Sequence, residues 1–251
     1  MASRKERTEA LAKNLNIYVS DAHIFTSDAI CLAAFCAPRH KDKCCDLGTG
    51  NGIIPLLWLR DFMPREITGV ELSESAIELF SKTLKENNLT DKVQLVNCDL
   101  RKLKGVLPYE YYDLVSINPP YKKLGTGIVN EGEDYKNARH EFTCTLEDAS
   151  KAASQLLKFG GRFCICQRPE RLPDIFEAMR KFKIEPKSMR EVIQRQGKEP
   201  SLVMVEGKKG SAQGFRIQSP LILEDENGNY SQEAQNLFLS YKYKEFTKDD
   251  E

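Results

Sequence analysis

Short apolar segments alternate with amphipathic segments along most of this chain, and this alternation limits the possible fold more than any other feature. Strands are predicted at residues 43–47, 67–72, 92–98, 112–117, 162–166 and 201–205, and helices are predicted between them. Strand–helix–strand units form right-handed crossovers, which place parallel strands in one sheet and helices on its faces. The sequence therefore predicts an α/β fold with a mostly parallel sheet and helices on both faces.

The length fits one large domain with appendages. The chain has 251 residues, and a domain takes roughly 150. Residues 21–210 carry the alternating pattern and are expected to form the main domain. Residues 1–20 are predicted to be a short helix with a connector, and residues 211–251 an extension packed on the same domain. Since no run approaches about 18 apolar residues and the charged start resembles no signal peptide, we expect a cytoplasmic protein.

Charge and cysteine content narrow the possible partners. The chain carries 37 basic and 37 acidic residues, but residues 151–209 hold 14 Lys or Arg against 7 Asp or Glu. This local excess suits an anionic partner such as RNA, although ordinary solvated charge explains it as well. The eight cysteines include no C-x-x-C pair and the three histidines no H-x3–5-H pattern. We therefore expect no metal site and interpret the cysteines as small buried apolar residues.

A glycine loop, Asp46-Leu47-Gly48-Thr49-Gly50-Asn51-Gly52, joins a predicted strand to a predicted helix. Glycines at every second position let the backbone turn tightly and approach a ligand. The spacing differs from the G-x-G-x-x-G of dinucleotide sites, and Asp46 would repel a phosphate while favouring the cationic amino-acid part of S-adenosylmethionine. Glu71, near the end of the second strand, is placed for ribose hydroxyls, and Asp99, after the third, for an adenine amine. A helix-capping turn is the alternative without function.

The motif Asn118-Pro119-Pro120-Tyr121 follows the fourth predicted strand, at the sheet edge where open α/β sheets bind ligands. Its prolines lack N–H groups, which leaves carbonyl acceptors exposed. The Asn118 side-chain oxygen and the Pro119 carbonyl can accept both N–H bonds of an exocyclic amine such as adenine N6. That pairing aims the nitrogen lone pair at a methyl sulfonium, and Tyr121 offers a face on which a flipped base stacks. The motif therefore indicates methyl transfer driven by orientation.

The two motifs together resemble those of class I methyltransferases that act on exocyclic or amide nitrogens. Beyond the motifs, the chain is similar over about residues 15–240 to the bacterial tRNA1(Val) adenine-37 N6-methyltransferase family, especially its Gram-positive branch. The segments that carry this resemblance are residues 25–29, 46–56, 138–141, 168–172, 196–199 and 225–230.

This resemblance implies a Rossmann-like class I methyltransferase fold with a seven-stranded sheet. It implies S-adenosylmethionine as cofactor, S-adenosylhomocysteine as product, and N6 of an adenine in tRNA as acceptor. Cofactor contacts are expected at Phe25, Asp28, Asp46, Gly48, Thr49, Gly50, Asn51, Gly52, Glu71, Asp99, Leu100 and Asn118. The target base is expected at Asn118, Pro119, Pro120 and Tyr121. Weaker signals suggest RNA contacts at Arg139, His140, Arg168 and Arg171, although capping, core or surface roles explain these residues equally well.

Several alternatives stay open at this point. Ribosomal RNA adenine is one. Guanine N2 is another, although its enzymes usually end the motif in Phe where this chain has Tyr121. Protein glutamine N5 is a third, although its helical substrate domain does not fit in the 45 residues before Asp46. A non-catalytic protein that binds S-adenosylmethionine and RNA is the alternative outside enzymes, and the intact Asn118 argues against it.

Two further segments are noted. The long loop at residues 124–134 is a candidate lid. Residues 241–244 interleave tyrosines with lysines as nucleic-acid-binding segments do, although a frayed terminus is the preferred interpretation.

Overall fold

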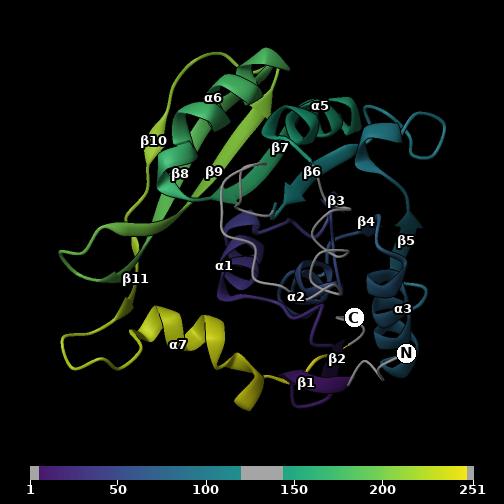
Figure 1. Ribbon diagram of the computed structural model, residues 1–251, viewed down its shortest axis with the longest axis vertical. Helices are drawn as coiled ribbons and strands as arrows, with labels where there is room; N and C mark the ends of the chain where they lie inside the picture. Colours follow the sequence, from purple (N-terminus) through teal and green to yellow (C-terminus); the bar gives the residue numbers. More distant parts are fainter. Residues whose placement is uncertain (1–5, 120–143, 248–251) are drawn as a thin grey trace, which may run out of the picture.

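The computed structural model describes residues 6–119 and 144–247, which form a central sheet with helices on both faces (Figure 1). The strands are β3 (Lys43–Leu47), β4 (Glu66–Glu71), β5 (Val93–Asn97), β6 (Tyr112–Ile117), β7 (Leu157–Gln167), β8 (Ile184–Arg195), β9 (Pro200–Lys209), β10 (Arg216–Ile217) and β11 (Leu221–Glu224). Their order is β10-β8-β9-β7-β6-β3-β4-β5, with β11 also paired to β8. Strands β3 to β7 run parallel, and β9 is antiparallel to both β7 and β8.

This arrangement confirms the predicted α/β, Rossmann-like architecture. Seven longer strands form the body of the sheet, and the two short strands β10 and β11 extend it along β8. Strand β8 is not among the strands that the residue pattern predicts. Its buried positions are separated by charged residues such as Lys187 and Arg190, so that neither a continuous apolar run nor a strict alternation marks it. Pairing with β9 decides its conformation.

The helices divide between two cores, one on each face of the sheet. Helices α1 (Ser27–Cys36), α2 (Ile53–Asp61) and α3 (Glu74–Glu86) pack in the first core. Helices α5 (Leu146–Leu156) and α6 (Leu172–Lys181) pack in the second. The adjacent Cys44 and Cys45 of β3 enter opposite cores, because successive side chains of a strand point to opposite faces. Both thiols are fully buried, as the interpretation of the cysteines predicts.

The predicted helix within residues 1–20 is wrong for the residues described there. Strands β1 (Arg7–Ala12) and β2 (Leu15–Val19) form an antiparallel hairpin instead. In β2 every second residue is buried, which is a strand period, and the segment is too short to reveal it. The hairpin also bonds to α3: the Tyr18 N–H donates to Thr83 Oγ1 at 2.9 Å. Tertiary contact therefore decides this segment.

The C-terminal segment closes back onto this hairpin. Helix α7 (Gln232–Phe238) and the 3-10 turn η3 (Ser240–Lys242) lead to residues that bond with the β1–β2 turn. The Lys13 N–H donates to the Lys244 carbonyl at 3.0 Å, and the Asn14 side chain bonds both backbone groups of Phe246. Phe246 is buried in the first core. The expectation of a frayed terminus is thus wrong as far as Thr247.

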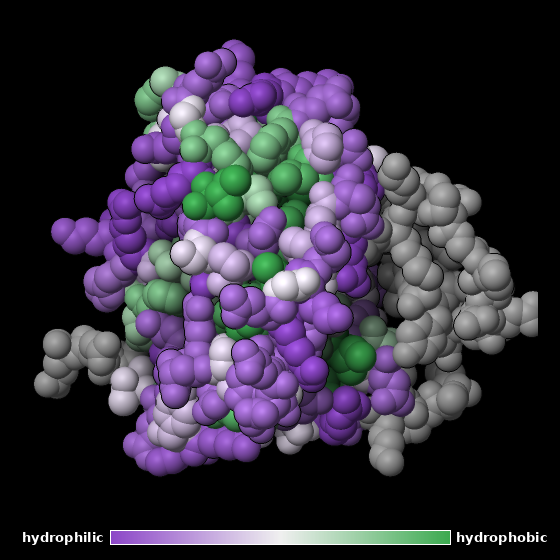
Figure 2. Space-filling model, turned by 90° about the vertical axis from the view of Figure 1, so that its left-hand side faces the viewer, coloured by the Kyte–Doolittle hydropathy of each residue, from purple (hydrophilic) through white to green (hydrophobic). Residues whose placement is uncertain are grey.

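Figure 2 looks onto the side of the molecule that carries β10 and β11, and shows a mostly hydrophilic face with apolar groups gathered in its upper half. Exposed apolar side chains on this edge include Phe215 and Ile217. Many basic residues of 151–209 form ion pairs: Arg180 with Glu185, Lys181 with Glu147, Arg190 with Glu233, and Arg195 with Glu224. These pairs offset much of the local positive excess, so charge alone gives little support for an RNA-binding face there. Among the described residues no helix is long and apolar enough to span a membrane.

Candidate active site

The glycine loop leaves β3 and enters α2 with three residues in the left-handed region. Gly48, Gly50 and Gly52 have φ of 65°, 58° and 88°. A Cβ atom on Gly52 would lie 2.2 Å from the Phe80 ring, so this glycine lets α2 and α3 pack closely. A Cβ atom on Gly50 would meet nothing within 4 Å. Gly50 therefore faces open space, and its lack of a side chain leaves room for a ligand.

Glu71, the last residue of β4, is held against this loop. Its Oε2 accepts from the Gly50 N–H at 2.8 Å, and its Oε1 accepts from the Leu72 and Ser73 N–H groups, each at 2.8 Å. The side chain is buried, with 4% of the residue exposed. A carboxylate can accept about four hydrogen bonds. Glu71 is thus oriented by backbone donors, with its carboxylate beside Gly50 of the loop.

Asp46, the fourth residue of β3, carries a buried carboxylate beside the loop. Its Oδ1 accepts from Ser116 Oγ at 2.5 Å, while its Oδ2 is buried without a hydrogen-bond donor among the residues described. Burial raises the pKa of Asp46 to about 7 and the nearby Glu71 charge adds to that rise, whereas the Ser116 and Thr49 hydroxyls oppose it. A buried acceptor without a donor fits a cationic group of a ligand, which would favour the charged carboxylate.

A cavity of about 200 Å³ lies between the loop and the segment that precedes α1. It is lined by Ala22, His23, Ile24, Phe25, Thr26, Ala29, Asp46, Gly48, Thr49, Gly50, Asn51, Ile53, Ile54 and Asn118. The Asn51 amide donates to the His23 carbonyl at 3.3 Å and to the Tyr18 carbonyl at 3.5 Å. These bonds attach the 18–23 segment to the loop, so that it forms one wall of the cavity.

Asn118, the first residue of the second motif, follows β6 and lines the same cavity. Its Oδ1 accepts from the Cys166 thiol at 3.1 Å. Strands β3 and β6 are neighbours in the sheet, which is why residues 72 positions apart in the chain share one cavity. Pro119 is the last described residue before the segment 120–143. The proposed residues Pro120, Tyr121, Arg139 and His140, and the candidate lid at 124–134, lie outside the described residues.

Seven of the predicted cofactor residues meet at the cavity, and the others lie elsewhere. Those at the cavity are Phe25, Asp46, Gly48, Thr49, Gly50, Asn51 and Asn118. Glu71 reaches it through its bond to Gly50, and Gly52 serves the packing of α2. Asp28 lies in the first turn of α1, outside the cavity lining, and its carboxylate accepts from the Ser27 hydroxyl at 3.3 Å.

The remaining predicted contacts are engaged locally. Asp99 precedes the 3-10 turn η1 (Leu100–Lys102), where it accepts from the Arg101 backbone and guanidinium, and that partner lowers the pKa of Asp99. Leu100 is buried in the second core. The proposed RNA contacts are also bonded nearby: Arg168 donates to the Ser201 carbonyl at 2.8 Å, and Arg171 donates to Asp174 at 2.6 Å.

Besides Thr26, Ala29, Ile53 and Ile54 of the cavity lining, two further contributors to the site are absent from the prediction. The segment 22–24 lines the cavity, and nothing in its composition marks it, since only folding brings it over the loop. Ser116 is the other. Its position among the buried apolar residues Leu114, Val115 and Ile117, just before Asn118, is a signal that could have identified it, because a buried hydroxyl needs a partner.

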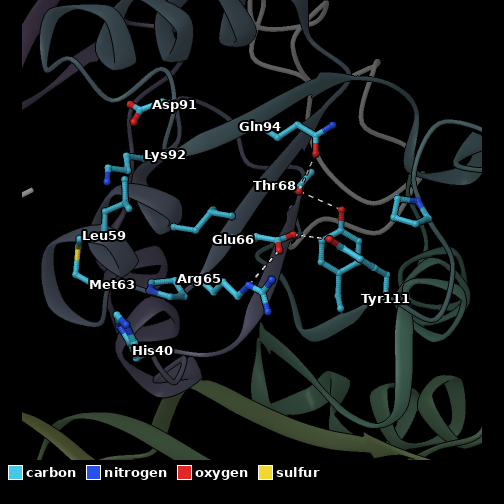
Figure 3. A pocket seen from close by; sticks show the side chains of 14 residues that line it. His40, Leu59, Met63, Arg65, Glu66, Thr68, Asp91, Lys92, Gln94 and Tyr111 are labelled. Carbon is cyan, nitrogen blue, oxygen red and sulfur yellow. Dashed lines mark hydrogen bonds and ion pairs between the residues drawn. The ribbon is translucent and has the colours of Figure 1, made fainter. Parts of the chain in front are cut away.

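A larger cavity of about 630 Å³ lies at the opposite edge of the sheet, near the amino ends of β4 to β6 (Figure 3). Its polar side chains bond with one another: Tyr111 donates to Glu66 at 2.6 Å, and Tyr112 donates to Thr68 at 3.0 Å. Open α/β sheets bind ligands at the carboxyl ends of their strands. The smaller cavity has that position and is lined by residues of the glycine loop and by Asn118, so it is the candidate active site.

This chain is similar to known methyltransferases. The family model described as "Methyltransferase small domain" matches residues 19–182. Two similar proteins of Porphyromonas gingivalis are each named "tRNA1(Val) (adenine(37)-N6)-methyltransferase". One is 26% identical over 80% of this chain and 78% of its own, and the other is 27% identical over 82% and 80%.

Solved structures share the fold. A predicted O-methyltransferase from Agrobacterium tumefaciens superposes with a TM-score of 0.69 at 21% identity, covering 85% of this chain and 96% of the other. A geranyl diphosphate methyltransferase in complex with sinefungin has a TM-score of 0.53 at 15% identity, covering 72% and 77%. At these identities the likeness concerns the fold alone.

Proposed function

Because this chain belongs to the methyltransferase small domain family, it is an S-adenosylmethionine-dependent methyltransferase, and we propose that its acceptor is N6 of an adenine in tRNA, of the tRNA1(Val) A37 type. The observation that carries this proposal is the shared cavity: Asn118 of the acceptor motif lies in the same small space as Asp46 and Gly50 of the cofactor loop. A methyl donor and an amine held there would be within reach of each other. Action on tRNA also implies a cytoplasmic protein.

The cofactor half of the cavity suits S-adenosylmethionine, which when bound supplies a methyl group on a sulfonium. Asp46 Oδ2 would accept a hydrogen bond from the ammonium group of S-adenosylmethionine. The open space beside Gly50 would let the cofactor lie against the backbone of the loop. Glu71 would accept from ribose hydroxyls, as its buried carboxylate already does from backbone N–H groups. Asp99 and Leu100 follow β5 at the same sheet edge and remain the proposed contacts for the adenine ring.

The acceptor half needs only hydrogen-bond acceptors. The Asn118 side-chain oxygen and the Pro119 carbonyl would each accept one N–H of the adenine amine. This pairing draws the nitrogen toward a tetrahedral geometry and directs its lone pair to the methyl group. The ammonium cation that methylation of the amine would form is acidic and loses a proton afterwards, so no strong base has to be present. Tyr121 is proposed to stack on the base, and Arg139, His140, Arg168 and Arg171 to contact the RNA.

The names of the Porphyromonas gingivalis relatives support tRNA as the acceptor. The test is methyl transfer from labelled S-adenosylmethionine to total unmodified tRNA, followed by nucleoside analysis. We expect N6-methyladenosine, and a tRNA1(Val) transcript with guanosine at position 37 should accept no label. If the protein binds cofactor but produces no N6-methyladenosine in tRNA, the acceptor proposal is wrong.

The variant Asn118→Ala isolates the acceptor motif. It should abolish transfer while leaving the cofactor dissociation constant within about twofold, since it removes an acceptor for the amine and little else. Asn236→Ala is a matched control, because Asn236 lies on α7, away from the cavity. Full activity of Asn118→Ala would remove the proposed role of the motif.

A further inference from the structure

Cys166 lies beside Asn118 at the carboxyl edge of the sheet. Strands β6 and β7 are parallel, and Ile117 lies opposite Ile165. Asn118 and Cys166 are therefore the next residues along the two neighbouring strands. The Cys166 sulfur is 3.1 Å from Asn118 Oδ1, in the geometry of a thiol that donates to the amide oxygen. Cys166 is fully buried, and its β9 neighbour in the ladder is Met204. Packing therefore holds the thiol in place.

An asparagine amide can turn over and exchange its oxygen with its NH2 group, and only the oxygen accepts a hydrogen bond. A thiol donor beside the amide favours the orientation in which the oxygen faces it. The oxygen has two lone pairs, so it can accept from the thiol and still accept one N–H of a substrate amine. The opposite orientation would present N–H groups to that amine and repel it.

We propose that Cys166 is a positioning residue for methyl transfer: its thiol selects the orientation in which Asn118 accepts from the amine. This inference rests on the proposed function, because it assumes that Asn118 receives the acceptor amine. Cys166 itself touches neither substrate nor cofactor in this scheme. Its effect therefore belongs to kcat rather than to cofactor binding.

The chain offers a matched control on the same strand. Cys164 lies two residues before Cys166, on the same face of β7, and is also fully buried. Cys164→Ala therefore opens a void of the same size in the same core without touching Asn118. Cys166→Ser keeps a donor of similar shape at the original position.

The experiment compares kcat, KM for tRNA, the cofactor dissociation constant and the melting temperature of the three variants. Cys166→Ala should lower kcat about three- to tenfold, as expected for the loss of one neutral hydrogen bond. Cys166→Ser should have most of the activity of the parent protein. Cys164→Ala should keep the kcat of the parent protein, although its melting temperature should fall as much as that of Cys166→Ala. Equal kcat for Cys166→Ala and Cys164→Ala, or a serine variant as slow as the alanine variant, would overturn the proposal.

A second readout does not depend on the acceptor. The side-chain NH2 resonances of Asn118, assigned by their absence in Asn118→Ala, should shift and broaden in Cys166→Ala and stay unchanged in Cys164→Ala. Unchanged resonances in Cys166→Ala overturn the positioning role. A protein that makes no N6-methyladenosine but shows the expected resonances would overturn the proposed function and leave the contact between Cys166 and Asn118 established.

Discussion

The hydroxyl of Ser116 donates to the Asp46 carboxylate at 2.5 Å, across the pairing of β6 with β3. Both residues are fully or almost fully buried. Ser116 lies two residues before Asn118, and Asp46 opens the glycine loop. One hydrogen bond therefore joins the strand that carries the acceptor motif to the carboxylate that faces the cofactor cavity. This bond and the burial of the carboxylate both affect the protonation state of Asp46, and three predictions depend on that state.

Cofactor affinity should rise with pH. Burial raises the pKa of Asp46 to about 7 in the ligand-free protein, whereas a bound cation favours the charged carboxylate, so binding releases a proton below that pH. We expect the affinity for S-adenosylmethionine to increase by up to about tenfold per pH unit below pH 7 and to level off above it. Isothermal titration between pH 5.5 and 8.5 measures this. A pH-independent affinity that Asp46→Asn leaves unchanged would contradict it.

The same group should make the ligand-free protein less stable as pH rises. Asp46 holds its proton up to about pH 7 when folded, but ionises near pH 4 when unfolded. The folded state thus binds more protons between about pH 4 and 7, and the free energy of unfolding falls across that window. Asp46→Asn should raise this free energy at pH 8 by on the order of 2 kcal/mol, after discounting for relaxation around the charge.

Asp113→Asn is the contrasting control for this prediction in urea unfolding. Asp113 pairs with Lys158 and accepts from the Lys43 N–H, and these partners lower its pKa. Asp113→Asn should therefore lower the free energy of unfolding at pH 8, whereas Asp46→Asn should raise it. A destabilised Asp46→Asn would show that its carboxylate is not strained by burial.

Removing the Ser116 hydroxyl should weaken cofactor binding. Ser116→Ala takes away the donor that stabilises the charged form of Asp46, so the pKa of Asp46 rises further. A bond to a charged group contributes about 1.5–3 kcal/mol, which predicts a dissociation constant about ten- to hundredfold higher at pH 7 and a smaller deficit at pH 9. Ser150→Ala, at a buried serine of α5, should bind normally. Normal binding by Ser116→Ala at pH 7 would refute the coupling.

Alanine substitutions at two glycines of the loop should affect different properties, stability at Gly52 and cofactor binding at Gly50. Gly52→Ala places a methyl group 2.2 Å from the Phe80 ring at φ 88°, so we expect a loss of about 2–4 kcal/mol in unfolding free energy. Gly50→Ala meets no atom within 4 Å, so it should cost only about 1 kcal/mol of left-handed strain.

Cofactor binding gives a second difference between the Gly50→Ala and Gly52→Ala variants. The methyl group of Gly50→Ala projects into the space proposed for the ligand, so this stable variant should lose cofactor binding. Thermal melts with and without S-adenosylmethionine measure both effects at once. If Gly50→Ala is stabilised by cofactor as much as the parent protein, the ligand does not lie against this residue.

The strand–helix alternation, the glycine loop and the acceptor motif can all be recognised in the sequence, because each is a local pattern. A run such as Lys43–Leu47 followed by Gly48, Gly50 and Gly52 can fold in few ways, and parallel strands place their carboxyl ends at one edge. That is enough to predict that Asp46 and Asn118 lie near each other. It does not specify which atoms meet.

The other features depend on tertiary contacts between residues that are far apart in the chain. The hairpin β1–β2 replaces a predicted helix since its buried face packs against α3 and its turn bonds to the C-terminal segment. The wall at residues 22–24 is held over the loop by Asn51. Strand register places Ser116 beside Asp46 and Cys166 beside Asn118. Which side chains form hydrogen bonds across two strands depends on how the strands pair and in which register. A local sequence pattern specifies neither.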